Sequence, residues 1–168
     1  MSALVLLFAL AGCGEERESG CVDYFIDTYN LDTIDYYGCS LAHMQCDATA
    51  VDRSVSTRLA GGGHQERYAS DETVELVARL ENNTDEQVSY TSVGCIVNSI
   101  DIDGPETGVR ISADCFSETT WTLESGETLE AAVNSMEGDR YGEGLVRAQL
   151  IFPSAEGSCC RCTQWWVD

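Results

Sequence analysis

Apolar and polar residues alternate along much of the chain after residue 51, with the period of two that is typical of half-buried β-strands. The clearest case is the segment 73–93. Its first alternating run ends in turn-forming residues at 82–86, and a second run starts at Val88. Two such runs joined by a short turn predict a β-hairpin. The apolar positions of the first run share one face, which we expect to be buried: Val74, Leu76, Ala78 and Leu80.

Shorter runs of the same kind predict further strands. They lie at residues 55–59, 96–102, 109–111, 119–123, 128–133 and 141–152. Turn residues separate them at 103–105 and 125–126. The last run again has one apolar face, made of Val146, Ala148, Leu150 and Phe152. Roughly seven short strands with frequent turns predict an all-β fold, an antiparallel β-sandwich.

The first residues of the chain do not follow this pattern. The apolar run from Ser2 to Ala11 is too short to span a bilayer as a helix, and it fits the apolar region of a secretory signal. At its end, Leu10-Ala11-Gly12-Cys13 resembles the bacterial lipobox at all four positions, although no Arg or Lys precedes the apolar run. The resemblance implies cleavage before Cys13, a diacylglycerol on its sulfur and an acylated N-terminus. A plain signal peptide with a cysteine there by chance is the alternative.

These features divide the chain into five parts. Residues 1–12 are expected to be a lipoprotein signal peptide and residues 13–20 an acidic tether. An aromatic, Cys-rich N-terminal unit follows at 21–50, and the β-sandwich covers 51–158. A Cys-rich tail, 159–168, is expected to pack on the N-terminal unit. The fold class is therefore an all-β sandwich with a disulfide-rich appendage.

Three segments of the sandwich resemble a known family. "VELVARLENNTDEQVSY", "WTLESGETLEAAV" and "GDRYGEGLVRAQLIF" are similar to the BsuPI-like intracellular proteinase inhibitor domain over residues 72–152. The resemblance implies an immunoglobulin-like sandwich, and it offers proteinase inhibition as an alternative function. The chain departs from the family in its export signal and in two cysteines within the domain, Cys95 and Cys115.

The chain has nine cysteines, and eight remain when Cys13 is set aside. An even number in an exported protein is typical of disulfides. We expect Cys95 to pair with Cys115, because both lie far from the others in the sequence. The other six fall near the two ends of the mature chain: Cys21, Cys39, Cys46, Cys159, Cys160 and Cys162. A thiolate metal site is the alternative, but the doubled Cys-x-x-Cys spacing of zinc ribbons is absent, so neither a metal nor another cofactor is predicted.

Charge narrows the choice of partners. The chain has 29 acidic and 9 basic residues, and its formal net charge is −20. Such a chain repels nucleic acid and anionic lipid headgroups, so nucleic acid is not an expected partner. Cations, basic proteins and a salty medium remain compatible with it.

The sequence contains few candidates for catalytic, metal-binding or ligand-binding residues. His43 and His64 have no partner at a catalytic spacing, and residues 101–106, "DIDGPE", fit a β-turn better than a calcium loop. Trp165 and Trp166 would point to opposite faces of a strand, so one of them is a candidate binding residue if it is exposed; packing under the Cys-rich unit is the alternative.

The sequence therefore predicts a non-enzymatic lipoprotein, held by its lipid anchor at the extracytoplasmic side of a bacterial membrane. It would act as a protein-binding or structural module of the cell envelope, with an envelope protein or a protease as partner. The alternative is a proteinase inhibitor of the BsuPI-like type.

Overall fold

The structure, a computed structural model, describes residues 50–93, 95–112, 118–154 and 157–168, and these form β-strands, connecting turns and one short 3-10 helix, η1 (Gly138–Tyr141). Within these ranges no helix is long and apolar enough to cross a membrane. The strands, in chain order, are β1 (Val51–Leu59), β2 (Arg67–Tyr68), β3 (Thr73–Asn82), β4 (Val88–Val93), β5 (Ser99–Asp103), β6 (Gly108–Ser112), β7 (Glu118–Leu123), β8 (Thr128–Glu137), β9 (Gly144–Ser154) and β10 (Gly157–Val167).

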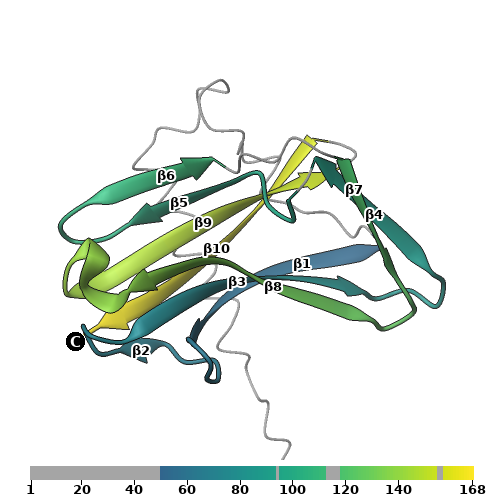
Figure 1. Cartoon of the computed structure of the whole chain (residues 1–168). Helices are drawn as coiled ribbons and strands as arrows, with labels where there is room; N and C mark the ends of the chain where they lie inside the picture. Colours follow the sequence, from purple (N-terminus) through teal and green to yellow (C-terminus); the bar gives the residue numbers. More distant parts are fainter. Residues whose placement is uncertain (1–49, 94, 113–117, 155–156) are drawn as a thin grey trace, which may run out of the picture.

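The strands form three sheets. A three-stranded sheet has the order β1-β3-β8, a five-stranded sheet has the order β2-β10-β9-β5-β6, and β4 pairs with β7. All pairs are antiparallel except β2 with β10. The two larger sheets lie in two layers, and the β4-β7 pair stands at one end of them (Figure 1). The all-β prediction is confirmed.

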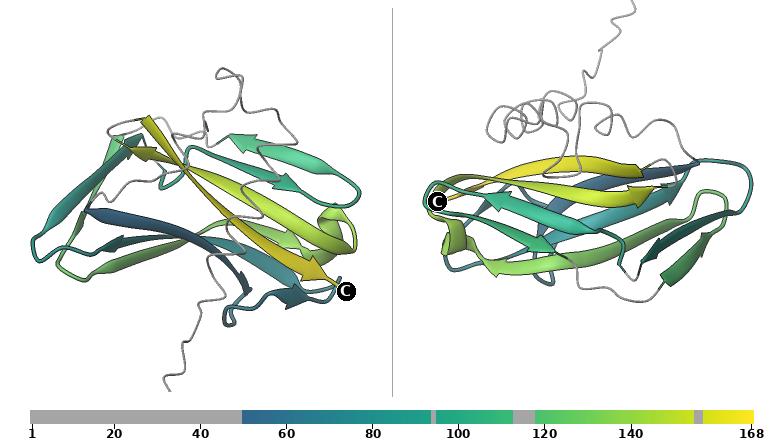
Figure 2. Two further views of the ribbon diagram at one scale, coloured as in Figure 1. Left: turned by 180° about the vertical axis from the view of Figure 1, so that it is seen from behind. Right: turned by 90° about the horizontal axis from the view of Figure 1, so that it is seen from above.

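The two layers meet along one side and diverge along the other. At the first side β1 contacts β10, although the two strands belong to different sheets. On the opposite side lie β6, the last strand of the large sheet, and β8, the last strand of the small one (Figure 2). The sandwich therefore has a closed side and an open side.

The predicted inward faces are confirmed. Both sets of alternating residues are fully buried in the core between the sheets: Val74, Leu76, Ala78, Leu80, Val146, Ala148, Leu150 and Phe152. Glu75 and Arg79, their neighbours on β3, are only partly buried. A β-bulge between Leu76 and Val77 interrupts the pairing with β8, and Val77 is buried as well.

The predicted hairpin at 73–93 is wrong. β3 pairs with β1 on one edge and with β8 on the other, so neither edge is available to β4, which pairs with β7 instead. The reason lies at Asn82, the last residue of β3. Its side chain is fully buried, and its Nδ2 donates to the carbonyl oxygens of Leu123 and Glu124, each at 3.0 Å. This ties the end of β3 to the turn between β7 and β8, so the chain leaves the sheet at this point.

Several strand boundaries also differ from prediction: β1 begins at Val51 and not at residue 55, β5 begins at Ser99 and not at residue 96, and β8 continues to Glu137. The strand expected at 141–152 begins at Gly144, because 138–141 form η1. The sheet continues through Val167, so the boundary expected between 158 and 159 falls inside β10, which pairs with β9 over its whole length. The lipobox, the tether and the N-terminal unit up to residue 49 lie outside the described residues.

Candidate binding surface around Trp166

Trp165 and Trp166 lie on opposite faces of β10, as predicted. Trp165 is buried in the core, with 1% of its surface exposed. Trp166 is 45% exposed on the outer face of the five-stranded sheet. Within the described ranges, the exposed large hydrophobic side chains are those of Trp166 and Val109. Of the two candidate binding tryptophans, Trp166 is therefore the one that a partner could reach.

Arg67 is the main neighbour of the Trp166 ring. Parallel pairing of β2 with β10 sets Arg67 beside Trp166, and the guanidinium carbon lies 5.7 Å from the ring centroid, a cation–π distance. The guanidinium Nε and Nη2 donate to the Asp168 carboxylate at 3.1 and 2.8 Å. This bidentate pair is exposed, so it orients the guanidinium more than it stabilises the fold.

The backbone beneath this surface is held firmly. The Trp166 N–H donates to the Glu66 carbonyl at 2.9 Å, and the Asp168 N–H donates to the Tyr68 carbonyl at 3.0 Å. The Tyr68 side chain is buried in the core, and its hydroxyl donates to the Gln65 carbonyl at 2.7 Å. Burial raises the pKa of this hydroxyl above its usual value, so it remains a neutral donor.

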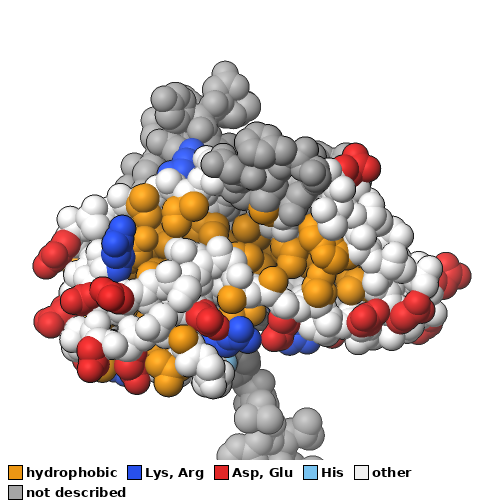
Figure 3. Space-filling view, in the orientation of Figure 1, with side chains coloured by type: hydrophobic (Ala, Val, Ile, Leu, Met, Phe, Trp, Pro, Cys, Tyr) orange, Lys and Arg blue, Asp and Glu red, His pale blue; other side chains and the backbone are white. Residues whose placement is uncertain are grey.

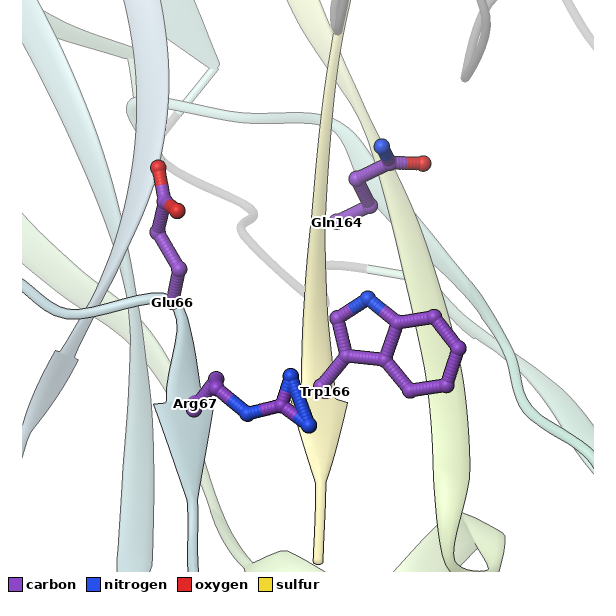
Figure 4. A pocket seen from close by; sticks show the side chains of 4 residues that line it. All are labelled: Glu66, Arg67, Gln164 and Trp166. Carbon is purple, nitrogen blue, oxygen red and sulfur yellow. The ribbon is translucent and has the colours of Figure 1, made fainter.

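The side chains enclose a small hollow. It measures about 240 Å³ and is lined by Glu66, Arg67, Gln164 and Trp166 (Figure 4). The indole ring of Trp166 extends to one side of β10, while Arg67 reaches toward β10 from β2 (Figure 4). An indole face beside a guanidinium, a carboxylate and an amide suits a ligand group that is partly apolar and partly polar. Trp and Arg are also the residue types that most often dominate binding energy at protein interfaces.

The outer face of the same sheet is buried toward the other end of β10. Cys160 and Cys162 project from that face, and both are buried. Their cross-strand neighbours on β9, Ile151 and Gln149, are buried too. The exposed surface around Trp166 is therefore confined to one end of this face.

Four of the nine cysteines lie in the described residues. Cys95, Cys159, Cys160 and Cys162 are disulfide-bonded. The expected Cys95–Cys115 pairing lies outside the described residues, because Cys115 does. So do the remaining predicted cysteines, Cys13, Cys21, Cys39 and Cys46. Within the described ranges no group of three or more potential ligands could hold a metal ion.

The other candidates from the sequence are the two histidines and the segment 101–106. His43 lies outside the described residues. His64 sits in the loop after β1, where its Nδ1 and the Thr57 carbonyl oxygen are 2.5 Å apart. The first half of the segment 101–106 is the end of β5, and its second half enters the β5–β6 turn, which is closed by the Gly104 N–H donating to the Thr107 carbonyl at 3.0 Å. Asp101 accepts two hydrogen bonds from Arg110 at 2.5 and 2.6 Å, so its carboxylate is already engaged.

Sequence reasoning missed Glu66, Arg67 and Gln164 as members of the hollow. Arg67 lies 101 residues from Asp168 in the chain, and no local pattern signals that β2 adds to the sheet beside β10. A two-residue strand is also too short to show an alternating pattern. Only the parallel pairing brings these side chains together.

No family model matches the chain, and no curated protein does. Among solved structures, the chain is similar to a β-glucosidase involved in saponin metabolism from intestinal bacteria, with a TM-score of 0.37 and 17% identity over 79% of this chain. A β-glucosidase from Listeria innocua in complex with isofagomine gives a TM-score of 0.35 and 10% identity over 70% of this chain. The chain spans 17% and 16% of the lengths of these two enzymes. Similarity at this level identifies neither the fold family nor the function.

Proposed function

We propose that the protein is a non-enzymatic lipoprotein of the bacterial cell envelope, anchored to the membrane through Cys13, and that it binds another envelope protein through the Trp166 surface. The observation that carries the binding role is the exposed Trp166 ring with Arg67 stacked against it, on a backbone fixed by the sheet. A rigid aromatic residue binds a partner with little loss of conformational entropy.

The anchor is supported by the sequence. The lipobox-like Leu10-Ala11-Gly12-Cys13 is followed by "GEERESG", a small and charged stretch of the kind that forms a flexible tether. Each buried methylene of a lipid chain contributes about 0.8 kcal/mol, so two or more chains are sufficient for stable attachment. The domain would then stand off the membrane on this tether.

We further propose that the sandwich is of the immunoglobulin-like type. The three-stranded sheet β1-β3-β8 and the run β10-β9-β5 of the larger sheet support this, because they match the central strands of the two immunoglobulin sheets in order and direction. Asn82, which carries part of the BsuPI-like resemblance, holds the β3–β4 and β7–β8 connections together. These contacts support a fold shared with the BsuPI-like domain. Proteinase inhibition is the alternative function.

The anchor is tested by Cys13→Ala. The variant is expected to leave the membrane fraction after a high-salt wash and to incorporate no radiolabelled fatty acid, whereas the unchanged chain should stay in the washed membranes and incorporate the label. Retention of Cys13→Ala in the washed membranes would exclude the lipid anchor.

The binding surface is tested by Trp166→Ala, with Trp165→Ala as its matched structural counterpart. Trp166→Ala is expected to unfold at nearly the unchanged temperature, because its side chain is half exposed. Trp165→Ala is expected to lose about 3–5 kcal/mol, because it leaves a cavity in the core. Chemical cross-linking in intact cells, read by mass spectrometry, should give an adduct that Trp166→Ala loses. An unchanged adduct pattern would show that the partner binds elsewhere.

A further inference from the structure

Among the described residues, a second apolar surface, separate from the one at Trp166, lies on the open side of the sandwich. Val109 on β6 pairs with Ile102 on β5, so both side chains point toward the same face of the sheet. Ile102 is 1% exposed, whereas Val109 is 41% exposed. The inner face of the five-stranded sheet is therefore buried at β5 but exposed at β6. The sheet extends at β6 beyond the three-stranded sheet that lies opposite it.

A hollow lies beneath this overhang. It measures about 420 Å³, and its walls come from Ile111 of β6, from the end of β8 and from η1. The apolar part of the wall is formed by Ile111, Met136 and Tyr141. Hydrophobic side chains gather across this side of the molecule, in the band between β6 and β8 (Figure 3). A band of partly exposed hydrophobic side chains is typical of an interaction site.

Both strands that border the hollow are sheet edges within the part of the chain that the structure describes: β8 pairs with β3 alone, and β6 with β5 alone. The pairing register shows which groups of β8 face away from β3. The Asn82 N–H donates to the Glu127 carbonyl at 3.0 Å, which makes Glu81/Thr128 a non-hydrogen-bonded pair. By alternation, the pair Arg79/Glu130 is also non-hydrogen-bonded, so the N–H and C=O of Glu130 point to the outer edge.

We propose that this edge accepts an extended segment of a basic partner protein, which adds as a further strand beside β8. The incoming strand would direct alternate apolar side chains into the hollow, against Ile111 and Met136. Strand addition of this type draws its affinity from backbone hydrogen bonds and its specificity from such pockets. The proposal is independent of the Trp166 surface and of the lipid anchor.

Charge defines the chemistry of this partner. Glu130 and Glu137 are exposed on β8, and the chain as a whole has a net charge of −20. Among the described residues, the lining contains one basic residue, Arg140, whose charge lies near the Tyr141 hydroxyl. Opposite charges on directly facing positions of paired strands stabilise the pair. A strand that alternates apolar with basic residues therefore fits the edge, and an acidic strand does not.

The test uses the mature full chain and a synthetic heptapeptide of alternating Val and Lys, labelled for fluorescence anisotropy. We expect saturable binding, and hydrogen exchange should slow in residues 128–136. A Val/Glu peptide of the same length is expected to bind at least about tenfold more weakly. A Val/Lys peptide methylated at alternate backbone nitrogens should not bind, because it cannot complete the ladder.

The matched variants are Glu130→Pro and Glu130→Ala. Proline removes an N–H that β3 does not use, so the domain should fold, but one hydrogen bond to the peptide is lost. The peptide carbonyl that would accept from the Glu130 N–H is then left without its hydrogen bond, so peptide binding should weaken about tenfold. Glu130→Ala keeps the N–H and should bind within a few-fold of the unchanged chain. Ile111→Ser, a change at a partly exposed residue of the wall, provides a second test and should weaken binding several-fold.

Three results would overturn the proposal. They are the absence of Val/Lys peptide binding, equal binding of the backbone-methylated peptide, and protection from exchange that appears around residues 164–168 in place of β8. The third result would assign basic peptides to the Trp166 surface.

Discussion

Removal of the Asn82 amide should be among the most destabilising single polar changes in this domain. The side chain is fully buried. Its Nδ2 donates to the carbonyls of Glu86, Leu123 and Glu124 at 2.7, 3.0 and 3.0 Å. Its Oδ1 accepts from the Thr84 N–H at 2.9 Å and from the Thr84 hydroxyl at 2.8 Å. One amide therefore connects the β3–β4 segment to the turn between β7 and β8.

The cost can be worked out from these contacts. Asn82→Ala leaves several backbone groups without their partner. An intramolecular hydrogen bond contributes about 1 kcal/mol net, and a buried group left unsatisfied costs about 1–3 kcal/mol. Because some of the carbonyls will find water in the relaxed turn, we expect a loss of about 3–5 kcal/mol. That is a large part of the stability of a single domain. It corresponds to a drop in Tm of roughly 10–20 °C.

Urea unfolding of the oxidised protein, followed by tryptophan fluorescence, measures this loss directly. Asn83→Ala is the control, because Asn83 is exposed and adjacent in the chain, and its effect should lie within about 0.5 kcal/mol. A loss below about 1 kcal/mol for Asn82→Ala, or equal losses for both variants, would show that the amide does not hold the two connections together.

Three further outcomes are expected. Leu76→Asp should prevent folding, because it buries a charge in the core, while Glu75→Gln should be nearly silent, because it weakens only a partly exposed ion pair with Arg58; similar thermal melts for the two would refute the register of β3. Burial raises the pKa of Tyr90 from about 10 to about 12, so the stability that its neutral hydroxyl provides is complete below pH 10 and is lost, by a few kcal/mol at most, as the pH rises to 12; Tyr90→Phe should flatten this dependence in urea melts, and an equal slope would contradict it. Alkylation of the denatured, unreduced mature protein should modify no cysteine, since Cys13 is blocked and the other eight are expected to be paired; two or more modified cysteines in the mass spectrum would favour a metal-binding or redox-active protein.

The sequence by itself determined which way the side chains of each strand point. Successive residues of any extended strand point to opposite faces, whatever the strand pairs with, so the alternation at 74–80 and 146–152 identified core residues. The same rule placed Trp165 and Trp166 on opposite faces of a strand, but only the structure showed that Trp165 is the buried one.

The tertiary structure decided which strands are neighbours. Backbone hydrogen bonds form equally well between any two extended segments, so the local sequence does not select the partner; the packing of whole layers does. That is why β3 pairs with β1 and β8 and not with β4. For the same reason, residues 159–167 of the expected separate tail belong to the five-stranded sheet. It is also why the hollow at Trp166 and the open edge at β8 were not foreseen. Each surface joins residues from strands that are distant in the chain, and such contacts exist only once the sheets have assembled.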